Sequence, residues 1–251
     1  MLDAASFLIA AALVATLVRV RRAAPGPAEQ DKPTGAGGYL ADLAAGLHFI
    51  RRDPLFRAIV AMILLTNMLD QAMTAVLIPV WAAERFDDAV PIGLVFGAVS
   101  AGAVVGSLLV SAYGQRLPRW RTYALAFLLG AVPKIFVLVL PVGLPVIAGV
   151  ALVCGVLIGA INPLLSAAEF ERIPAGLRAR VLGAVGGLAW AGIPLGGLLG
   201  GMLASTLGAT GSILAVGAAY LLVTLDPLIR RRTWQLMNRP PSDAAAVSAT
   251  A

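Results

Sequence analysis

Long apolar runs, separated by short charged or Gly/Pro-rich gaps, dominate the sequence. A membrane-spanning helix needs about 20 mostly apolar residues. The runs that approach or exceed this length lie at 2–19, 56–82, 92–113, 122–140, 144–168, 181–204 and 212–229. The pattern predicts an all-α membrane protein with seven transmembrane helices.

Composition supports this interpretation, and the placement of charge adds a topology. The chain is 59% hydrophobic and 13% charged, whereas soluble domains carry about 25% charged residues. Its net charge of +6 could indicate nucleic-acid binding, but nearly all of the 19 Lys and Arg residues lie in every second gap. Basic residues accumulate on the cytoplasmic side of membrane proteins. We therefore predict a multi-pass cell-membrane protein that binds no nucleic acid, with its N-terminus outside and its C-terminus in the cytoplasm.

The segments outside the apolar runs predict a linker, a surface helix and a tail. The stretch "AAPGPAEQDKPTGAGG" is typical of a linker. Leu40, Leu43, Leu47 and Ile50 then recur at helical spacing, which predicts a short amphipathic helix on the cytoplasmic surface. The predicted divisions are a transmembrane helix at 1–22, a cytoplasmic linker with this helix at 23–54, a six-helix domain at 55–230 and a disordered tail at 231–251.

Four segments carry a resemblance to a known family. They are "LDAASFLIAAALV", "AGLHFIRRDPLFRAIV", "GSLLVSAYGQRLPRWR" and "IPAGLRARVLG". Together they resemble the sixth helix and the C-terminal half of a major facilitator superfamily transporter, in the branch that contains the enterobactin exporter and macrolide-efflux proteins. The third segment departs from the superfamily's loop motif, because Gln115 replaces an acid and Pro118 a glycine, and Ala179 replaces a glycine in the fourth.

The resemblance implies a secondary active exporter of a small drug-like, macrolide-like or siderophore-like amphipathic molecule. Proton coupling and alternating access would be part of that mechanism. Its partners would be the lipid bilayer, the substrate, protons and an N-terminal transporter half. The loop arginines Arg116, Arg119, Arg178 and Arg180 become gating candidates. The alternative is a truncated or half transporter that is inactive alone and acts as a scaffold or partner for a separate N-terminal half.

Polar residues inside the apolar runs are the candidate binding residues, because they are costly in lipid. Asn67, Asp70, Gln71 and Thr74 share one helical face. Asp70 could bind a proton or a cationic substrate, since desolvation favours the neutral carboxyl group that proton coupling requires. The competing interpretation is that this face only bonds a neighbouring helix.

A second candidate group follows a proline in the run at 144–168. Pro163 should free a backbone carbonyl near residue 159 and kink the helix. Asn162 and Ser166 could then face the cargo, although bonding between helices explains them equally well.

Two further charges have local interpretations. Lys134 could pair with Asp70, but we expect it to extend to the outer surface instead. Asp226 should pair with Arg230 four residues later.

Residue types argue against an enzyme, a metal or a cofactor. One histidine, His48, and one cysteine, Cys154, give no metal-ligand or nucleophile constellation. A seven-helix retinal protein is disfavoured as well, because the last apolar run contains no lysine for a Schiff base.

Overall fold

The computed structural model describes residues 36–238. The chain divides into two compact units, residues 1–41 and 42–251. The first unit is described only from Ala36 to Ala41, where helix α2 begins. All regular elements between residues 36 and 238 are helical. They are α2 (Ala36–Arg52), α3 (Pro54–Ala72), η2 (Met73–Leu77), α4 (Ile78–Phe86), α5 (Val90–Tyr113), η3 (Gly114–Arg116), α6 (Arg119–Leu125), η4 (Ala126–Ala131), α7 (Val132–Phe136), η5 (Val137–Val139), α8 (Leu144–Ile158), α9 (Ile161–Arg172), η6 (Ala175–Leu177), α10 (Arg178–Ala191), α11 (Ile193–Thr224), α12 (Asp226–Ile229), α13 (Arg231–Trp234) and η7 (Gln235–Asn238).

Five helical segments in the described part are long and apolar enough to cross a membrane. They are Pro54–Phe86, Val90–Tyr113, Arg119–Val139, Leu144–Arg172 and Ala175–Ile229. The all-α membrane class is therefore confirmed. The predicted number of seven spans stays a prediction, because the run at 2–19 lies outside the described residues and the last two predicted runs share one 55-residue segment.

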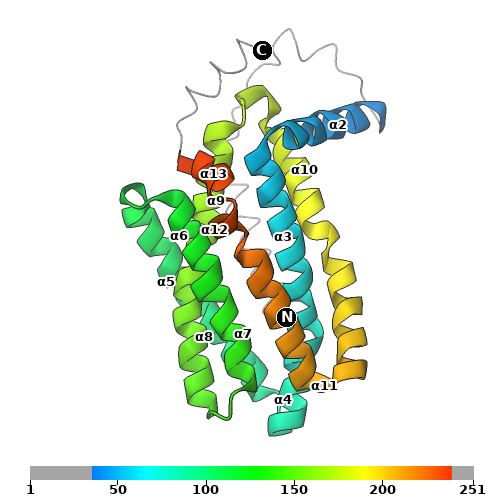
Figure 1. Ribbon diagram of the computed structural model, residues 1–251, viewed down its shortest axis with the longest axis vertical. Helices are drawn as coiled ribbons and strands as arrows, with labels where there is room; N and C mark the ends of the chain where they lie inside the picture. Colours follow the sequence, from blue (N-terminus) through cyan, green and yellow to red (C-terminus); the bar gives the residue numbers. More distant parts are fainter. Residues whose placement is uncertain (1–35, 239–251) are drawn as a thin grey trace, which may run out of the picture. The chain divides into compact units, whose positions relative to one another are not determined.

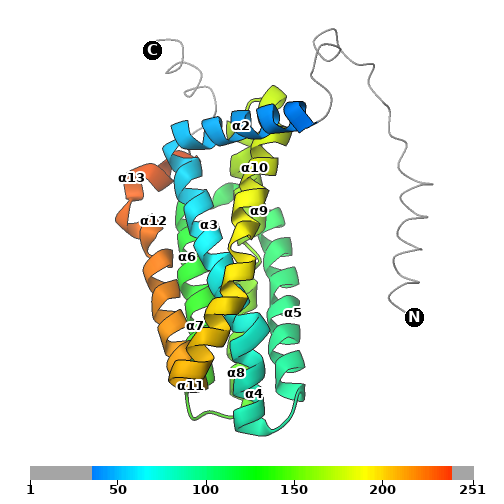
Figure 2. The same cartoon turned by 90° about the vertical axis from the view of Figure 1, so that its right-hand side faces the viewer.

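A reversal at Gly208 divides that last segment. Gly208 has φ 67° and ψ 178°, a conformation that is open to glycine but strained for other residues. The Ser212 hydroxyl donates a hydrogen bond to the Gly208 carbonyl over 2.6 Å. The two parts of α11 run in opposite directions on either side of this glycine, as both views show (Figures 1 and 2). The gap predicted between the runs at 181–204 and 212–229 is thus a tight backbone reversal.

Two prolines inside long helices leave carbonyls that neighbouring helices satisfy. Proline lacks the N–H that would bond the carbonyl four residues earlier. For Pro163 this is the Gly159 carbonyl, which accepts a hydrogen bond from the Ser107 hydroxyl over 3.0 Å. This confirms the predicted free carbonyl, and the helix is interrupted there between α8 and α9. For Pro133 it is the Leu129 carbonyl, which accepts from the Cys154 thiol over 3.7 Å.

Glycines bring α5 and α8 into close contact. A Cβ added to Gly102 or Gly106 would clash with the α8 backbone. A Cβ added to Gly155, or to Gly159 just beyond the end of α8, would clash with the α5 backbone. Small residues at such positions let two helices approach closely in a membrane.

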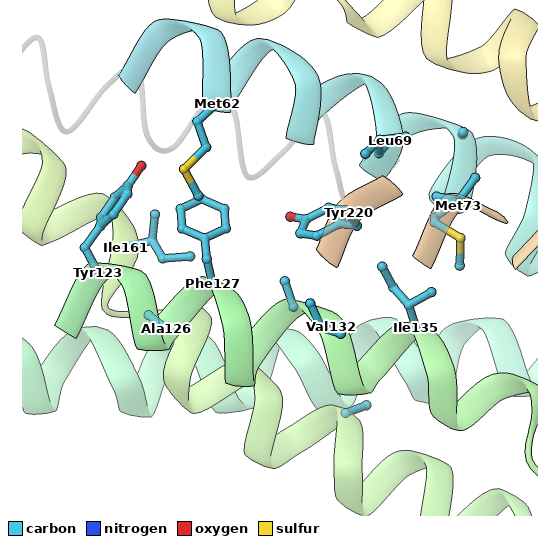
Figure 3. Close-up of a cluster of buried hydrophobic side chains, with 14 of the residues drawn as sticks. Met62, Leu69, Met73, Tyr123, Ala126, Phe127, Val132, Ile135, Ile161 and Tyr220 are labelled. Carbon is cyan, nitrogen blue, oxygen red and sulfur yellow. The ribbon is translucent and has the colours of Figure 1, made fainter. Parts of the chain in front are cut away.

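The main core lies between α3, the α6–η4–α7 segment and the second part of α11. Figure 3 shows Met62 of α3 against the Phe127 ring of η4, and Tyr220 of α11 reaching into the same layer. Tyr123, Ile135 and Tyr220 are each at most 2% exposed. These tightly packed helices surround the polar site described below.

Within the second unit, the remainder of α2 packs against the helical bundle. Leu43 and Leu47 join a second apolar cluster with Ile50, Phe56 and Val181. A helix is present where the amphipathic helix is predicted, and this part of its apolar face contacts protein. Its cytoplasmic location stays a prediction. The close approach requires Gly46, because a Cβ there would lie 2.5 Å from the Arg180 carbonyl oxygen.

Residues 231–238 differ from the predicted disordered tail. They form α13 and η7, and Trp234 and Met237 are 0% and 1% exposed. Trp234 stacks on Tyr123 with ring centroids 5.4 Å apart. The prediction of disorder from residue 231 onward is wrong for this segment, because a buried tryptophan holds it against α6. The rest of the predicted tail, together with the predicted segments up to residue 35, lies outside the described residues.

Candidate functional site

A cavity of about 420 Å³ lies between the helices of the second unit. Its lining mixes apolar and aromatic groups with a few polar ones, which is the usual composition of a small-molecule pocket. The lining residues are Ile63, Thr66, Asn67, Asp70, Phe127, Ala131, Lys134, Ile158, Ile161, Asn162, Leu165, Val185, Ala189, Trp190 and Tyr220. They come from all of α3, η4, α7, α8, α9, α10 and α11.

A cluster of three polar side chains lies in the wall of this cavity. The Lys134 Nζ lies 3.3 Å from Asp70 Oδ1, and the Tyr220 hydroxyl donates a hydrogen bond to Asp70 Oδ2 over 3.1 Å. Both oxygens of the carboxylate are therefore engaged by groups from two other helices. The preferred prediction that Lys134 reaches the outer surface is wrong. The pairing alternative holds, because a partly buried ammonium group gains more from a nearby carboxylate than from a long extension through lipid.

Departures from regular α-helix lie beside both members of the ion pair. The π-helix η2 begins three residues after Asp70, and the π-helix η4 ends three residues before Lys134. Such wide turns inside α-helices are frequent at functional sites. The Thr74 hydroxyl donates to the Asp70 carbonyl over 2.8 Å at the start of η2. Each charged residue of the pair is therefore within one helical turn of a π-helix.

The structure brings some of the predicted binding residues together and separates others. Asn67 and Asn162 line the cavity with Asp70, and Asn67 also donates from its amide to the Ala189 carbonyl over 2.8 Å. Gln71 packs against α11, since a Cβ on Gly196 would lie 2.8 Å from the Gln71 Cβ.

Thr74 and Ser166 are exposed and do not line the cavity. Their proposed binding roles stay predictions, as do those of the residues in the cavity wall.

Tyr220 and Trp190 are cavity residues that the sequence interpretation missed. Tyr220 lies in the apolar run "AVGAAYLLVT", where its hydroxyl was a polar signal of the same kind as Asp70. Trp190 lines the cavity although the residue is 71% exposed. A large aromatic ring that is open on one side offers a stacking surface to a ligand.

The family model described as Major Facilitator Superfamily matches residues 60–247. The chain belongs to this superfamily. The predicted family is therefore confirmed, and the helical, multi-pass membrane character agrees with it.

The relatives of this superfamily member are multidrug efflux pumps by name. Multidrug efflux pump Tap from Mycolicibacterium fortuitum is 29% identical over 217 residues, which are 86% of this chain and 53% of that protein. Proteins of the same name from Mycobacterium bovis and Mycobacterium tuberculosis are 31% identical over 179 residues, covering 71% of this chain and 42% of each relative. The chain thus spans about half the length of these relatives. No solved structure matches it.

The predicted gating arginines of this superfamily member lie near one end of the bundle, at the starts of α6 and α10 and in η3 (Figure 1). Arg119 and Glu171 form a bidentate ion pair between α6 and α9. Arg180 pairs with Asp42 over 2.6 Å. Arg178 donates to the carbonyls that end α9, including that of Phe170 over 2.9 Å. Arg116 is exposed at the end of η3.

Arg172 forms a further network at this end, with an acid that the sequence interpretation did not single out. The Arg172 guanidinium lies 2.8 Å from Asp53 Oδ2 and donates to the Leu236 carbonyl over 3.1 Å. Asp53 Oδ1 accepts from the Leu55 amide over 2.8 Å and so caps the start of α3. Arg172, at the end of α9, is therefore linked to the start of α3 and to η7.

The predicted local pair of Asp226 and Arg230 is confirmed, with Arg230 Nε 2.5 Å from Asp226 Oδ1.

Proposed function

We propose that this chain is the cargo-binding C-terminal half of a secondary active exporter of small amphipathic molecules. Membership of the superfamily and the names of its efflux-pump relatives support transport. The cavity of about 420 Å³, with its apolar and aromatic walls, has a size that suits a small organic molecule.

The ion pair of Asp70 and Lys134 is the observation that supports this function most strongly. Charged side chains inside a membrane helix are costly, and they mark substrate or ion pathways. Here the pair lies in the cavity wall, and the Tyr220 hydroxyl donates a hydrogen bond to its carboxylate. A purely structural pair would not need to face an open cavity, so we assign the cluster to cargo and proton handling.

We further propose that protons drive the export through Asp70. Protonation of this carboxylate removes the charge that holds Lys134 at 3.3 Å. The helices that carry the two residues would then be free to separate. A proton could in this way shift the balance between inward-open and outward-open arrangements, as alternating access requires.

A second six-helix half would complete the transporter. Transporters of this kind bind their substrate between two related halves, near the middle of the bilayer. The accumulation of basic residues in every second gap supports a cytoplasmic location for the α13 end of the bundle, which carries Arg119, Arg172 and Arg178. In this arrangement residues 55–230 form the C-terminal half, and residues 1–22 correspond to the last helix of the other half.

Efflux of the neutral dye Nile red from cells that express the chain, with and without the N-terminal half of the Mycolicibacterium fortuitum relative, tests these proposals. We expect export that stops when a protonophore collapses the proton gradient, and an at least tenfold slower rate for Asp70→Asn. The control is Asp87→Asn, which neutralises an exposed loop acid with φ 51°, a conformation that asparagine adopts readily. Gradient-dependent efflux that survives Asp70→Asn would remove Asp70 from the mechanism. Efflux that requires co-expression of the N-terminal half of the Mycolicibacterium fortuitum relative would support the two-half proposal.

A further inference from the structure

The ion pair has a consequence for the charge of the cargo. Asp70, Lys134 and Tyr220 are the titratable groups among the described residues that line the cavity. With a carboxylate and an ammonium group 3.3 Å apart and a neutral phenol beside them, the wall of this half has no net charge. A cavity that contained Asp70 alone would instead attract cations.

We propose that Lys134 is the residue that sets the charge class of the cargo, so that this half binds uncharged or zwitterionic amphipathic molecules and only weakly binds lipophilic cations. This inference rests on the proposed transport function and makes it more specific. It narrows the initial expectation from the sequence, in which Asp70 could bind a cationic substrate.

Competition for Asp70 gives the physical reason. Both carboxylate oxygens are already occupied, one by Lys134 and the other by the Tyr220 hydroxyl. A cation that approached the carboxylate would have to compete with the ammonium group, whose side chain is 21% exposed, and leave it without its counterion. An uncompensated charge in a partly buried position costs free energy. A neutral molecule avoids this cost, because it can use the apolar surface and leave the ion pair intact.

The remaining lining groups fit such cargo. Phe127 and Trp190 offer aromatic faces, while Asn162 and Thr66 are polar without charge. A zwitterion has an additional option, since its two charges can lie across the Asp70–Lys134 pair in the opposite sense. The ion pair therefore works as a filter that discriminates by net charge, whereas the apolar walls tolerate different shapes.

A pair of size-matched ions gives a direct test. Tetraphenylphosphonium and tetraphenylborate have nearly the same shape and opposite charge, so the ratio of their affinities reports the charge of the cavity. The complete chain is reconstituted in lipid nanodiscs, and binding of each ion is corrected with empty nanodiscs. An unpaired charge about 6 Å from a bound ion, at an effective dielectric constant near 20, changes affinity on the order of a hundredfold.

The variants should move this ratio in opposite directions. Lys134→Gln leaves Asp70 unpaired and should shift the ratio toward the cation by at least tenfold. Asp70→Asn leaves Lys134 unpaired and should shift it toward the anion by a similar factor. The double variant and Lys134→Arg should both return close to the wild-type ratio. Arg57→Gln, which removes a positive charge from an exposed position outside the cavity, should leave the ratio unchanged.

The outcomes separate this inference from the proposed function. If wild-type protein binds both ions and Lys134→Gln does not change their ratio, the charge-filter inference fails while binding by the cavity stands. If neither ion, nor Nile red, binds to wild-type protein, the proposed cargo site fails and the inference with it. Should Lys134→Gln not fold, as judged by size-exclusion chromatography, the Asp70→Asn shift decides the question on its own.

Discussion

Truncation of Trp234 should destabilise the whole bundle, although sequence pattern places this residue in a tail. Trp234 is 0% exposed, stacks on Tyr123 and donates from Nε1 to Asp226 Oδ2 over 2.8 Å. The same segment supplies the Leu236 carbonyl to Arg172 and the Asn238 side-chain oxygen to the Trp120 amide. Trp234→Ala removes the aromatic anchor on which these contacts depend.

The expected loss can be worked out from burial. A large aromatic side chain buries about 150–250 Å², which corresponds to about 4–6 kcal/mol at 25 cal/mol per Å². This figure is an upper bound, because an unfolded chain already hides part of that surface. Substitution of buried aromatic residues by alanine costs about 3–5 kcal/mol, and we expect Trp234→Ala to fall in that range. Trp234→Phe retains a ring for stacking and loses one hydrogen bond, so it should cost about 1–2 kcal/mol.

Thermal unfolding in detergent, followed by size-exclusion chromatography, measures the effect. For a chain of this size, about 2–4 °C is lost per kcal/mol, so Trp234→Ala should melt roughly 10 °C below wild type. Limited trypsin digestion should also cut faster after Arg231 and Arg232. Trp190→Ala is the matched control, because that tryptophan is 71% exposed and should have a small effect on stability. Equal melting temperatures for Trp234→Ala and Trp190→Ala would refute the idea that α13 is an integral part of the fold.

Two further predictions concern helix packing and capping. Gly106→Ala should greatly reduce the yield of folded protein, because the added Cβ would clash with the α8 backbone. Gly97→Ala is the control and should be neutral or slightly stabilising, because a Cβ there has no heavy atom within 4 Å. Similar melting temperatures for the two variants would contradict the described packing of α5 on α8. Asp53→Ala should cost about 2–4 kcal/mol, since it removes the α3 cap and leaves the half-buried Arg172 unpaired. Asp53→Asn keeps a capping oxygen and should recover part of this loss in the same melting assay, and full recovery would show that the ion pair contributes nothing.

Hydropathy was sufficient to predict the helical membrane class, because each apolar run carries its own signal. Hydropathy could not predict whether the Lys134 side chain extends to the membrane surface or pairs with a carboxylate. Sequence spacing gives the distance of a lysine from the end of its own helix, but the partner carboxylate lies on another helix, 64 positions away. Only the packing of α7 against α11, which brings Lys134 within reach of Asp70 on α3, decides between extension to the surface and pairing.

The polar stripe on α3 shows a second limit of sequence patterns. Asn67, Asp70, Gln71 and Thr74 span about 100° of a helix with 3.6 residues per turn. A stripe that wide meets more than one neighbour, so Asp70 faces the cavity while Gln71 packs on α11. The freed carbonyl at Gly159 was predictable, in contrast, because proline geometry is local and needs no knowledge of neighbouring helices.

The Cys154 thiol of α8 donates a hydrogen bond to the Leu129 carbonyl of η4, so its accessibility can report separation of these two helices. The sequence contains one cysteine, so no engineered cysteine-free background is needed before thiol chemistry can be used. The Cys154 side chain is 3% exposed and lies between α8 and η4, the segment that leads into Lys134. Its rate of alkylation by a membrane-permeant maleimide therefore measures how often these two helices part. Comparison of that rate across a pH gradient would follow the motion of the Lys134 helix in unmodified protein.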